Sequence, residues 1–251
     1  MAKPRVLIPA AGSGSRSGLP YPKTLYPVYG EPILVRIIRL LHDIDPRPTV
    51  VVSPEGRREI ADCLSGYGLS ADLVLQEAPT GMGDAILCVQ DAPGYQIDGD
   101  LLVVWGDIPL LQQTTVSAVL EAHFTEDNIF TFPTRFVDSA YTVVSRGEWS
   151  QVEALVETRE AGLEPGPGER DIGLFLFKTR PVIELLRERL PQGRGRGTGE
   201  HGFLYVVEQL AKRGHRISAL PIATELDIIS LNRISDLAHL GTLYGKQSEM
   251  L

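Results

Sequence analysis

Residues 7–34 read Leu-Ile-Pro-Ala-Ala-Gly-Ser-Gly-Ser-Arg-Ser-Gly-Leu-Pro-Tyr-Pro-Lys-Thr-Leu-Tyr-Pro-Val-Tyr-Gly-Glu-Pro-Ile-Leu. The stretch passes from a short apolar run, predicted to be a strand, into a loop of small residues from Ala10 to Gly14. Small residues let backbone N–H groups approach a phosphate or a base closely. Arg16 and Lys23 then add two cations, which suit bidentate and point-charge contacts to phosphate respectively. The combination indicates a polyphosphate site after the first strand.

Two familiar phosphate loops do not fit this stretch. It contains no GxxxxGK[ST] pattern, which excludes a P-loop. Gly12-x-Gly14 opens a GxGxxG pattern, but Ser17 stands at the third glycine position, which argues against a dehydrogenase. Taken alone, Gly12-x-Gly14 also fits an ordinary Gly/Ser connector, so the whole segment carries the argument.

Short apolar runs and helix-like stretches alternate around this segment. Strands are predicted at residues 6–8, 49–53, 71–75 and 100–105, with helices at 31–41, about 56–64 and 84–90. Such short, continuous apolar runs bounded by turn residues are typical of buried parallel strands. The rhythm predicts an α/β fold with a Rossmann-like, mostly parallel sheet flanked by helices.

The pattern changes after Gly106. Strand-like runs come close together and indicate a mixed extension of the sheet: 128–133, 141–145, 152–156, 172–177 and, later, 216–220. Helices are predicted at 115–123, 180–190, 203–212 and 230–243. The glycine-rich stretches 162–168 and 193–199 are predicted to be mobile loops.

Composition limits the class of protein. Apolar residues make up 43% and the formal net charge is -8, which is ordinary for a globular protein and disfavours broad nucleic-acid binding. The only cysteines, Cys63 and Cys88, form no CxxC spacing. No apolar run approaches a membrane span, and the run at residues 6–11 is too short for a signal peptide. We therefore expect a soluble cytoplasmic protein that binds neither nucleic acid nor membranes.

The opening segment resembles the nucleotidyltransferase signature AAGxGxR…PK…L…GxP. Four further stretches match the family's elements in order: residues 76–85, 105–110, 155–157 with 171–173, and 231–237. The chain is most similar to the uridyltransferase half of the enzymes that make UDP-N-acetylglucosamine, without their acetyltransferase half. The resemblance implies one nucleotidyltransferase domain over residues 1–251, with a nucleotide-binding part at about 1–110 and an acceptor-binding part at about 111–251.

The resemblance also assigns roles to residues. Arg16 would hold the β and γ phosphates, and Lys23 would bridge the α-phosphate and the acceptor phosphate. Asp107 follows a predicted strand, where open α/β sheets bind ligands, and with Asn232 it would hold Mg²⁺. Helix capping is the alternative for both of these residues. The nucleotide pocket would be formed by Ala10, Ala11, Gly12, Gly14, Gln76, Gly81 and Asp107.

The acceptor-binding residues depart from the family pattern. Thr142 stands where the family has glycine, and Asp171 replaces the asparagine of its NTG motif, whereas Glu157 is retained. An ionised Asp only accepts hydrogen bonds, whereas Asn also donates. We therefore expect Thr142, Glu157 and Asp171 to bind an acceptor other than N-acetylglucosamine 1-phosphate.

Together these features predict an enzyme that joins a nucleoside triphosphate to a sugar 1-phosphate or a similar phosphorylated small molecule and releases pyrophosphate. UTP is the favoured donor. The alternatives are a cytidylyltransferase acting on a non-sugar phosphate and a non-catalytic nucleotide-sensing module on the same fold.

Overall fold

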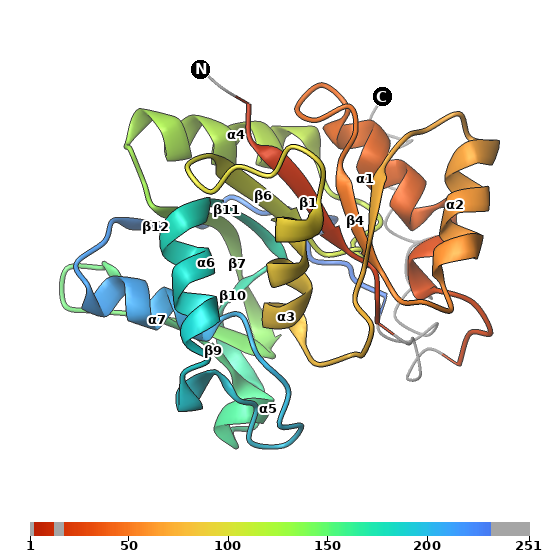
Figure 1. Ribbon diagram of the computed structural model, residues 1–251. Helices are drawn as coiled ribbons and strands as arrows, with labels where there is room; N and C mark the ends of the chain where they lie inside the picture. The colour runs from red at the N-terminus through yellow and green to blue at the C-terminus, as the bar shows by residue number, and fades with distance from the viewer. Residues whose placement is uncertain (1–2, 13–17, 232–251) are drawn as a thin grey trace, which may run out of the picture.

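A central eight-stranded sheet organises the computed structural model, which describes residues 3–12 and 18–231. The strand order is β10-β7-β11-β6-β1-β4-β5, and β12 pairs with β7. Figure 1 shows helices packed on both faces of this sheet. The predicted α/β architecture is confirmed.

The first half of the chain builds the parallel part of the sheet. Its elements are β1 (Arg5–Pro9), η1 (Lys23–Leu25), β2 (Pro27–Val28), β3 (Glu31–Pro32), α1 (Ile33–Leu41), β4 (Thr49–Val52), α2 (Arg57–Gly66), β5 (Asp72–Leu75), α3 (Met82–Leu87), η2 (Cys88–Asp91) and β6 (Asp100–Val104). Strand β1 pairs in parallel with β4 and β6, and β4 pairs in parallel with β5. The loops that follow these four strands therefore leave the same edge of the sheet.

The second half adds the mixed extension. Its elements are α4 (Gln113–Thr125), β7 (Phe130–Ala140), β8 (Thr142–Arg146), β9 (Val152–Glu157), α5 (Thr158–Ala161), β10 (Gly166–Asp171), β11 (Leu174–Lys178), α6 (Thr179–Glu188), η3 (Pro191–Gly193), α7 (Tyr205–Lys212) and β12 (Ile217–Leu220). Strand β11 runs antiparallel between β6 and β7, and β10 runs antiparallel beside β7. Strands β8 and β9 form a separate hairpin.

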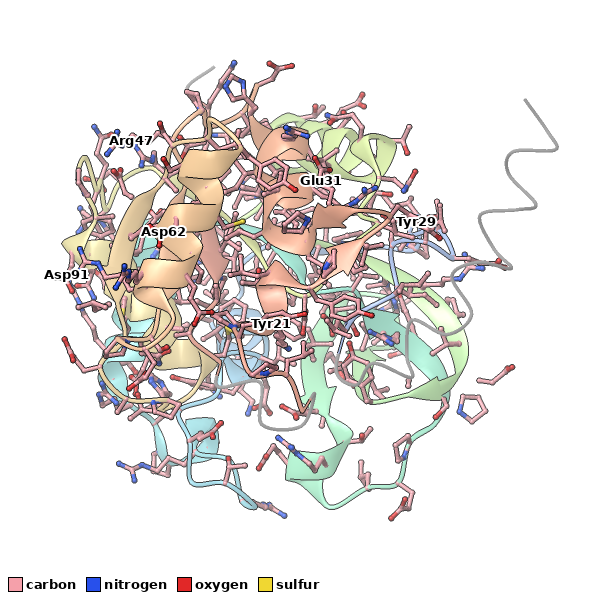
Figure 2. The ribbon with its side chains drawn as sticks, turned by 90° about the vertical axis from the view of Figure 1, so that its right-hand side faces the viewer. Tyr21, Tyr29, Glu31, Arg47, Asp62 and Asp91 are labelled. Carbon is pink, nitrogen blue, oxygen red and sulfur yellow. The ribbon has the colours of Figure 1, made fainter. Side chains whose placement is uncertain are left out.

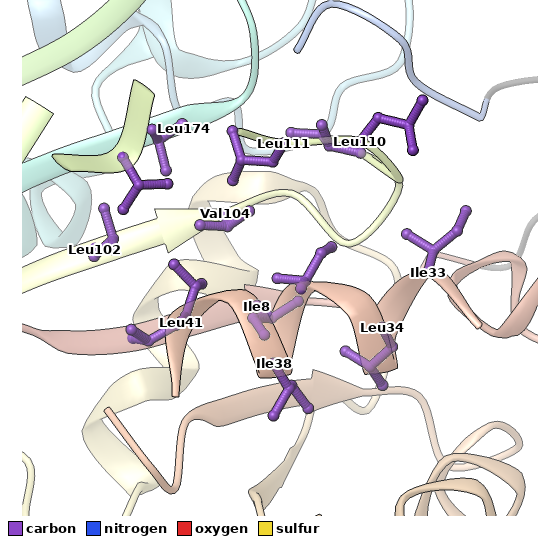
Figure 3. Packing of buried hydrophobic residues seen from close by; sticks show 14 of the residues in the cluster. Ile8, Ile33, Leu34, Ile38, Leu41, Leu102, Val104, Leu110, Leu111 and Leu174 are labelled. Carbon is purple, nitrogen blue, oxygen red and sulfur yellow. The ribbon is translucent and has the colours of Figure 1, made fainter. Parts of the chain in front are cut away.

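Alternate residues of the central strands face two separate hydrophobic cores. Ile8, Leu102 and Val104 pack on the side of α1, whereas Leu101 and Val103 pack on the side of α6 and α7. Figure 3 shows Ile8, Leu102 and Val104 against the side chains of α1. This alternation is the period of two that a sheet covered on both faces requires.

Several predicted boundaries differ from the structure: β7 runs on to Ala140, although the sequence predicted a strand only to residue 133. Residues 166–168, predicted to lie in a mobile loop, begin strand β10. Pairing with β7 provides backbone hydrogen bonds that hold even this glycine-rich stretch in an extended conformation. Strand β11 begins at Leu174 rather than at residue 172, since Gly173 has a φ of +81° and interrupts the extended backbone. The helix predicted at 230–243 lies almost wholly outside the described residues. Within the described ranges, no helix is long and apolar enough to cross a membrane.

Candidate active site

Lys23 and Asp107 meet at the carboxyl edge of the parallel strands. Lys23 Nζ lies 2.5 Å from Asp107 Oδ2, and their side chains are 27% and 12% exposed. Lys23 begins the short helix η1, whereas Asp107 lies three residues beyond the end of β6. Sequence reasoning assigned these residues to different ligands, phosphate and metal, and the structure brings the two charges together.

Gly106 allows the loops after β1 and β6 to approach each other. A Cβ atom at this position would lie 2.8 Å from the carbonyl oxygen of Pro9, the last residue of β1. Such a contact is closer than side-chain carbons tolerate, so a larger residue would push the two loops apart. Glycine before Asp107 therefore places the carboxylate beside the loop that begins at Ala10.

The segment before Asn232 closes the other side of Asp107. The amide of Leu231 donates to the Asp107 carbonyl at 2.8 Å, and Lys23 Nζ donates to the Leu231 carbonyl at 3.4 Å. Asn232 follows directly but lies outside the described residues, as do Gly14 and Arg16. Asp107 Oδ1 is buried and has no hydrogen-bond partner among the described residues. This oxygen therefore has hydrogen-bonding and ligating capacity that the described residues do not use.

A pocket of about 330 Å³ opens where β1, β4 and β5 end. Ala10, Ala11 and Gly12, assigned from the sequence to the nucleotide pocket, form one wall, and Ser53 and Pro79 lie on the others. Tyr21, labelled in Figure 2, also lines the pocket. A carboxyl-edge pocket with a wall of small residues suits a planar base or a ribose.

Gln76 and Gly81 contact each other but do not line that pocket. The Gln76 side-chain amide donates to the Gly81 carbonyl at 3.1 Å. Gly81 has a φ of +116°, and a Cβ atom there would lie 2.4 Å from the His201 carbonyl oxygen. The His201 amide in turn donates to the Thr80 carbonyl, at 2.7 Å. The segment around His201 therefore packs against the loop assigned to base recognition, a contact that the sequence did not predict.

Thr142 and Asp171 bind each other at the predicted acceptor site. The Thr142 hydroxyl donates to Asp171 Oδ1 at 2.5 Å, and the Gly173 amide donates to Oδ2 at 2.8 Å. Burial raises the pKa of Asp171, which is fully inaccessible to solvent. Glu157 lies opposite Thr142 in the β8–β9 hairpin, and its carboxylate is 3.2 Å from Arg159. The three predicted residues thus gather in one place.

Sequence reasoning missed Arg170 and Tyr141, which lie beside this group. The Arg170 guanidinium is 3.8 Å from the centroid of the Tyr141 ring and also donates to the Tyr141 hydroxyl. Burial, followed by the charge of Asp171, raises the pKa of Tyr141 well above its usual value, and the charge of Asp107 acts in the same direction. Tyr141 is therefore close enough to Asp171 and to Asp107 for both charges to act on its hydroxyl group. In the sequence, Tyr141 stands between two stretches that match family elements, residues 105–110 and 155–157, and this is the only signal that the sequence offered.

The arrangement can bind and align phosphate groups. Lys23 supplies a cation, and Asp107 supplies an oxygen that has no partner among the described residues, beside a pocket of nucleoside size. Among residues 3–12 and 18–231, no three His, Cys, Asp or Glu side chains form a metal-binding cluster. Mg²⁺ needs no such cluster, because one or two carboxylates together with substrate phosphates usually hold it. The donors present at Asp107 therefore fit Mg²⁺.

Comparisons with known proteins identify the family of the chain. Residues 6–165 match the model of the MobA-like NTP transferase domain. Bifunctional protein GlmU of Kineococcus radiotolerans is 30% identical over 94% of this chain and 48% of its own length. GlmU of Hydrogenovibrio crunogenus is 27% identical over 97% and 52% respectively. The chain thus spans about half the length of these curated relatives.

The fold also matches a solved structure. A Bacillus anthracis protein described as a glucose-1-phosphate thymidylyltransferase, solved with sucrose, superposes with a TM-score of 0.76. The match covers 95% of this chain and 94% of the other at 18% sequence identity, so it supports the fold alone.

The fold and the family match define a nucleotidyltransferase. The chain belongs to the family of the MobA-like NTP transferase domain. The predicted membership of the nucleotidyltransferases, and the similarity to the enzymes that form UDP-N-acetylglucosamine, are confirmed.

Proposed function

We propose that this protein transfers a nucleotidyl group from a nucleoside triphosphate, with UTP favoured, to a sugar 1-phosphate or a similar phosphorylated small molecule. The contact between Lys23 and Asp107 beside the Ala10–Gly12 pocket carries the proposal. Its position supports the proposal, because both side chains lie at the edge of the sheet where such folds bind nucleotides, and there a cation would bind phosphate and a carboxylate would bind a metal. The nucleotide-binding part would comprise about residues 1–110, and the acceptor-binding part about residues 111–251.

In the proposed reaction, a phosphate oxygen of the acceptor attacks the α-phosphorus in line. A new P–O bond forms there, the bond between the α-phosphorus and its bridging oxygen to the β-phosphorus breaks, and pyrophosphate leaves with that oxygen. The attacking phosphate is already anionic, so the protein needs no strong base. Its contribution is alignment and neutralisation of charge.

Each predicted residue has one task in this scheme. Arg16 holds the β and γ phosphates, and Lys23 leaves Asp107 to bridge the α-phosphate and the acceptor phosphate. Asp107 and Asn232 would hold Mg²⁺, which would neutralise negative charge on the phosphates. Oδ1 of Asp107, which has no partner within residues 3–12 and 18–231, supports this assignment. Ala10, Ala11, Gly12 and Gly14 would line the base pocket, and Gln76 and Gly81 would contribute from the loop that contains Pro79, which lines it.

We further propose that the acceptor is not N-acetylglucosamine 1-phosphate. The hydrogen bond between Thr142 and Asp171 supports this, because it occupies groups that glycine and asparagine would leave open. An N-acetyl group that relied on an Asn side-chain donor would find only acceptor oxygens. A buried group left without its donor costs about 1–3 kcal/mol, enough to change the preferred substrate.

A screen of the four nucleoside triphosphates against a panel of sugar 1-phosphates tests the proposal. Pyrophosphate release is the readout, with and without a divalent metal. Release that depends on one triphosphate and one acceptor class is the expected result. Triphosphate binding without release for any acceptor would favour the alternative, a nucleotide-sensing module.

A further inference from the structure

Arg170 is the one lysine or arginine that is buried among the described residues. Its side chain belongs to β10 and the residue is only 7% exposed. Placing a cation in the interior is costly unless an opposite charge accompanies it. Arg170 therefore needs an anion as its partner.

The other buried charged side chains near Arg170 already have partners. Glu169 forms an ion pair with Arg146 at 2.7 Å, and Asp107 pairs with Lys23. No carboxylate of the described residues lies within 4.0 Å of the Arg170 guanidinium. Its hydrogen bonds go to two neutral oxygens, the Asp171 carbonyl and the Tyr141 hydroxyl.

Asp171 is the nearest carboxylate in the chain but does not neutralise Arg170 by contact. Consecutive residues of a strand point to opposite faces, so the two side chains leave β10 in different directions. Both Asp171 oxygens accept hydrogen bonds on their own face, from Thr142 and Gly173. Arg170 keeps donors for an anion that the described residues do not supply.

The surroundings of Arg170 connect it to the proposed reaction centre. Its guanidinium stacks on Tyr141, and the Tyr141 hydroxyl also shares a hydrogen bond with Ser230. The residue after Ser230, Leu231, contacts both Lys23 and Asp107. The segment Ser230–Leu231 thus connects the Arg170–Tyr141 pair to Lys23 and Asp107, the residues assigned to phosphate and metal.

We propose that Arg170, stacked on Tyr141, binds an oxyanion of the acceptor substrate. The inference rests on the proposed transferase function. The oxyanion is either the acceptor's reacting phosphate or a second acidic group, such as a carboxylate at the far end of a sugar. Arginine suits both, since its planar fork matches the geometry of phosphate and carboxylate.

A binding titration tests the assignment without turnover. The chain has two tryptophans; Trp105 packs against Gly173, and Trp149 is 84% exposed. In a Trp149→Phe background, Trp105 fluorescence can follow titration with inorganic phosphate. We expect Arg170→Met to weaken phosphate binding about tenfold or more, the usual effect of losing a charge-assisted hydrogen bond. Equal affinity in the two proteins, or no binding to either, would overturn the assignment.

Arg135→Met is the matched control. Arg135 lies opposite Arg170 in the β7–β10 register, but its guanidinium has a counter-charge in Glu225 at 3.3 Å. We expect the affinity of this variant for phosphate to stay within about twofold of the parent, the scatter of a surface substitution. If Arg170→Met does not fold, Arg170→Lys is used in its place. Lysine keeps the positive charge but lacks the planar guanidinium that can donate two parallel hydrogen bonds. Phosphate affinity in Arg170→Lys equal to the parent's would then count against recognition by the guanidinium.

Steady-state kinetics distinguish the two sources of the oxyanion. Glucose 1-phosphate and glucuronic acid 1-phosphate differ by one remote carboxylate. A KM that Arg170→Met raises equally for both assigns Arg170 to the common phosphate, and a rise confined to the acid assigns it to the carboxylate. Unchanged KM values for both acceptors would contradict the proposal. If no triphosphate and acceptor pair releases pyrophosphate, the transferase proposal fails, and the phosphate titration still reports on Arg170 by itself.

Discussion

The ammonium nitrogen of Lys23 lies 2.5 Å from Oδ2 of Asp107, across a separation of 84 residues in sequence. Each group neutralises the other in this contact, and we assign each a different partner in the proposed reaction. Exchange of this internal ion pair for phosphate and metal would keep both charges compensated throughout. The pair therefore links nucleotide binding to metal binding in the proposed cycle.

Replacement of Lys23 should reduce turnover without unfolding the protein. Lys23→Ala removes a cation that we place on the α-phosphate, and Arg16→Ala should act similarly on the β and γ phosphates. A charge-assisted contact contributes about 1.5–3 kcal/mol, or roughly ten- to a hundredfold in rate. Rates of pyrophosphate release measure the loss. Lys178→Ala, at a surface lysine that contacts Asp127, is the control and should retain the parent rate.

Activity should require a divalent metal and the Asp107 carboxylate. Asp107→Asn keeps the shape of the side chain and removes the charge that would hold Mg²⁺, so we expect at least a hundredfold loss of rate, on the order of several kcal/mol. Asp98→Asn, in the surface ion pair with Arg180, serves as control. Full pyrophosphate release in excess chelator would exclude the metal assignment.

Restoring the family pattern at the acceptor site should change substrate preference. The double variant Thr142→Gly, Asp171→Asn removes the internal hydrogen bond and provides a side-chain donor. We expect the ratio of kcat/KM for N-acetylglucosamine 1-phosphate over glucose 1-phosphate to rise by about tenfold, as for one buried hydrogen bond. An unchanged ratio would mean that neither position contacts the acceptor.

Asp171 also predicts a pH dependence of stability. Burial raises its pKa in the folded state, so Asp171 releases its proton less readily in the folded protein than in the unfolded chain. Asp171 therefore contributes stability below its unfolded pKa, and this contribution is lost as pH rises through the folded pKa. We expect the unfolding free energy of Asp171→Asn, relative to the parent, to increase from pH 4 to pH 7 in denaturant titrations. A difference that stays constant with pH would show that Asp171 titrates normally.

Gly81 should tolerate no side chain. Its φ of +116° strains any L-residue, and a Cβ atom would contact the backbone of His201. Gly81→Ala should therefore cost about 1–3 kcal/mol of stability and raise the KM for the nucleotide. Gly99→Ala is the control, since the nearest atom to its Cβ would lie at 3.5 Å. Equal melting temperatures for both variants would contradict the close packing at Gly81.

The sequence predicted those parts of the molecule that depend on local pattern. The apolar runs of β1, β4, β5 and β6 specify buried parallel strands, and the small residues from Ala10 mark the loop that we assign to nucleotide binding. The sequence pattern could not predict β10, because Gly166–Asp171 has no apolar alternation and becomes a strand only beside β7. Contacts between distant segments, such as Lys23 with Asp107 and Arg170 with Tyr141, depend on the tertiary fold. No spacing in the chain encodes them.

Pyrophosphate release tests the central claim most directly. The measurement mixes the purified protein with UTP, Mg²⁺ and each member of a sugar 1-phosphate panel, and compares the parent with Lys23→Ala. We predict rapid release by the parent with at least one acceptor, abolished by chelator and reduced roughly ten- to a hundredfold in the variant. Release at equal rates from both proteins, or no release with any triphosphate and acceptor, would contradict the claim.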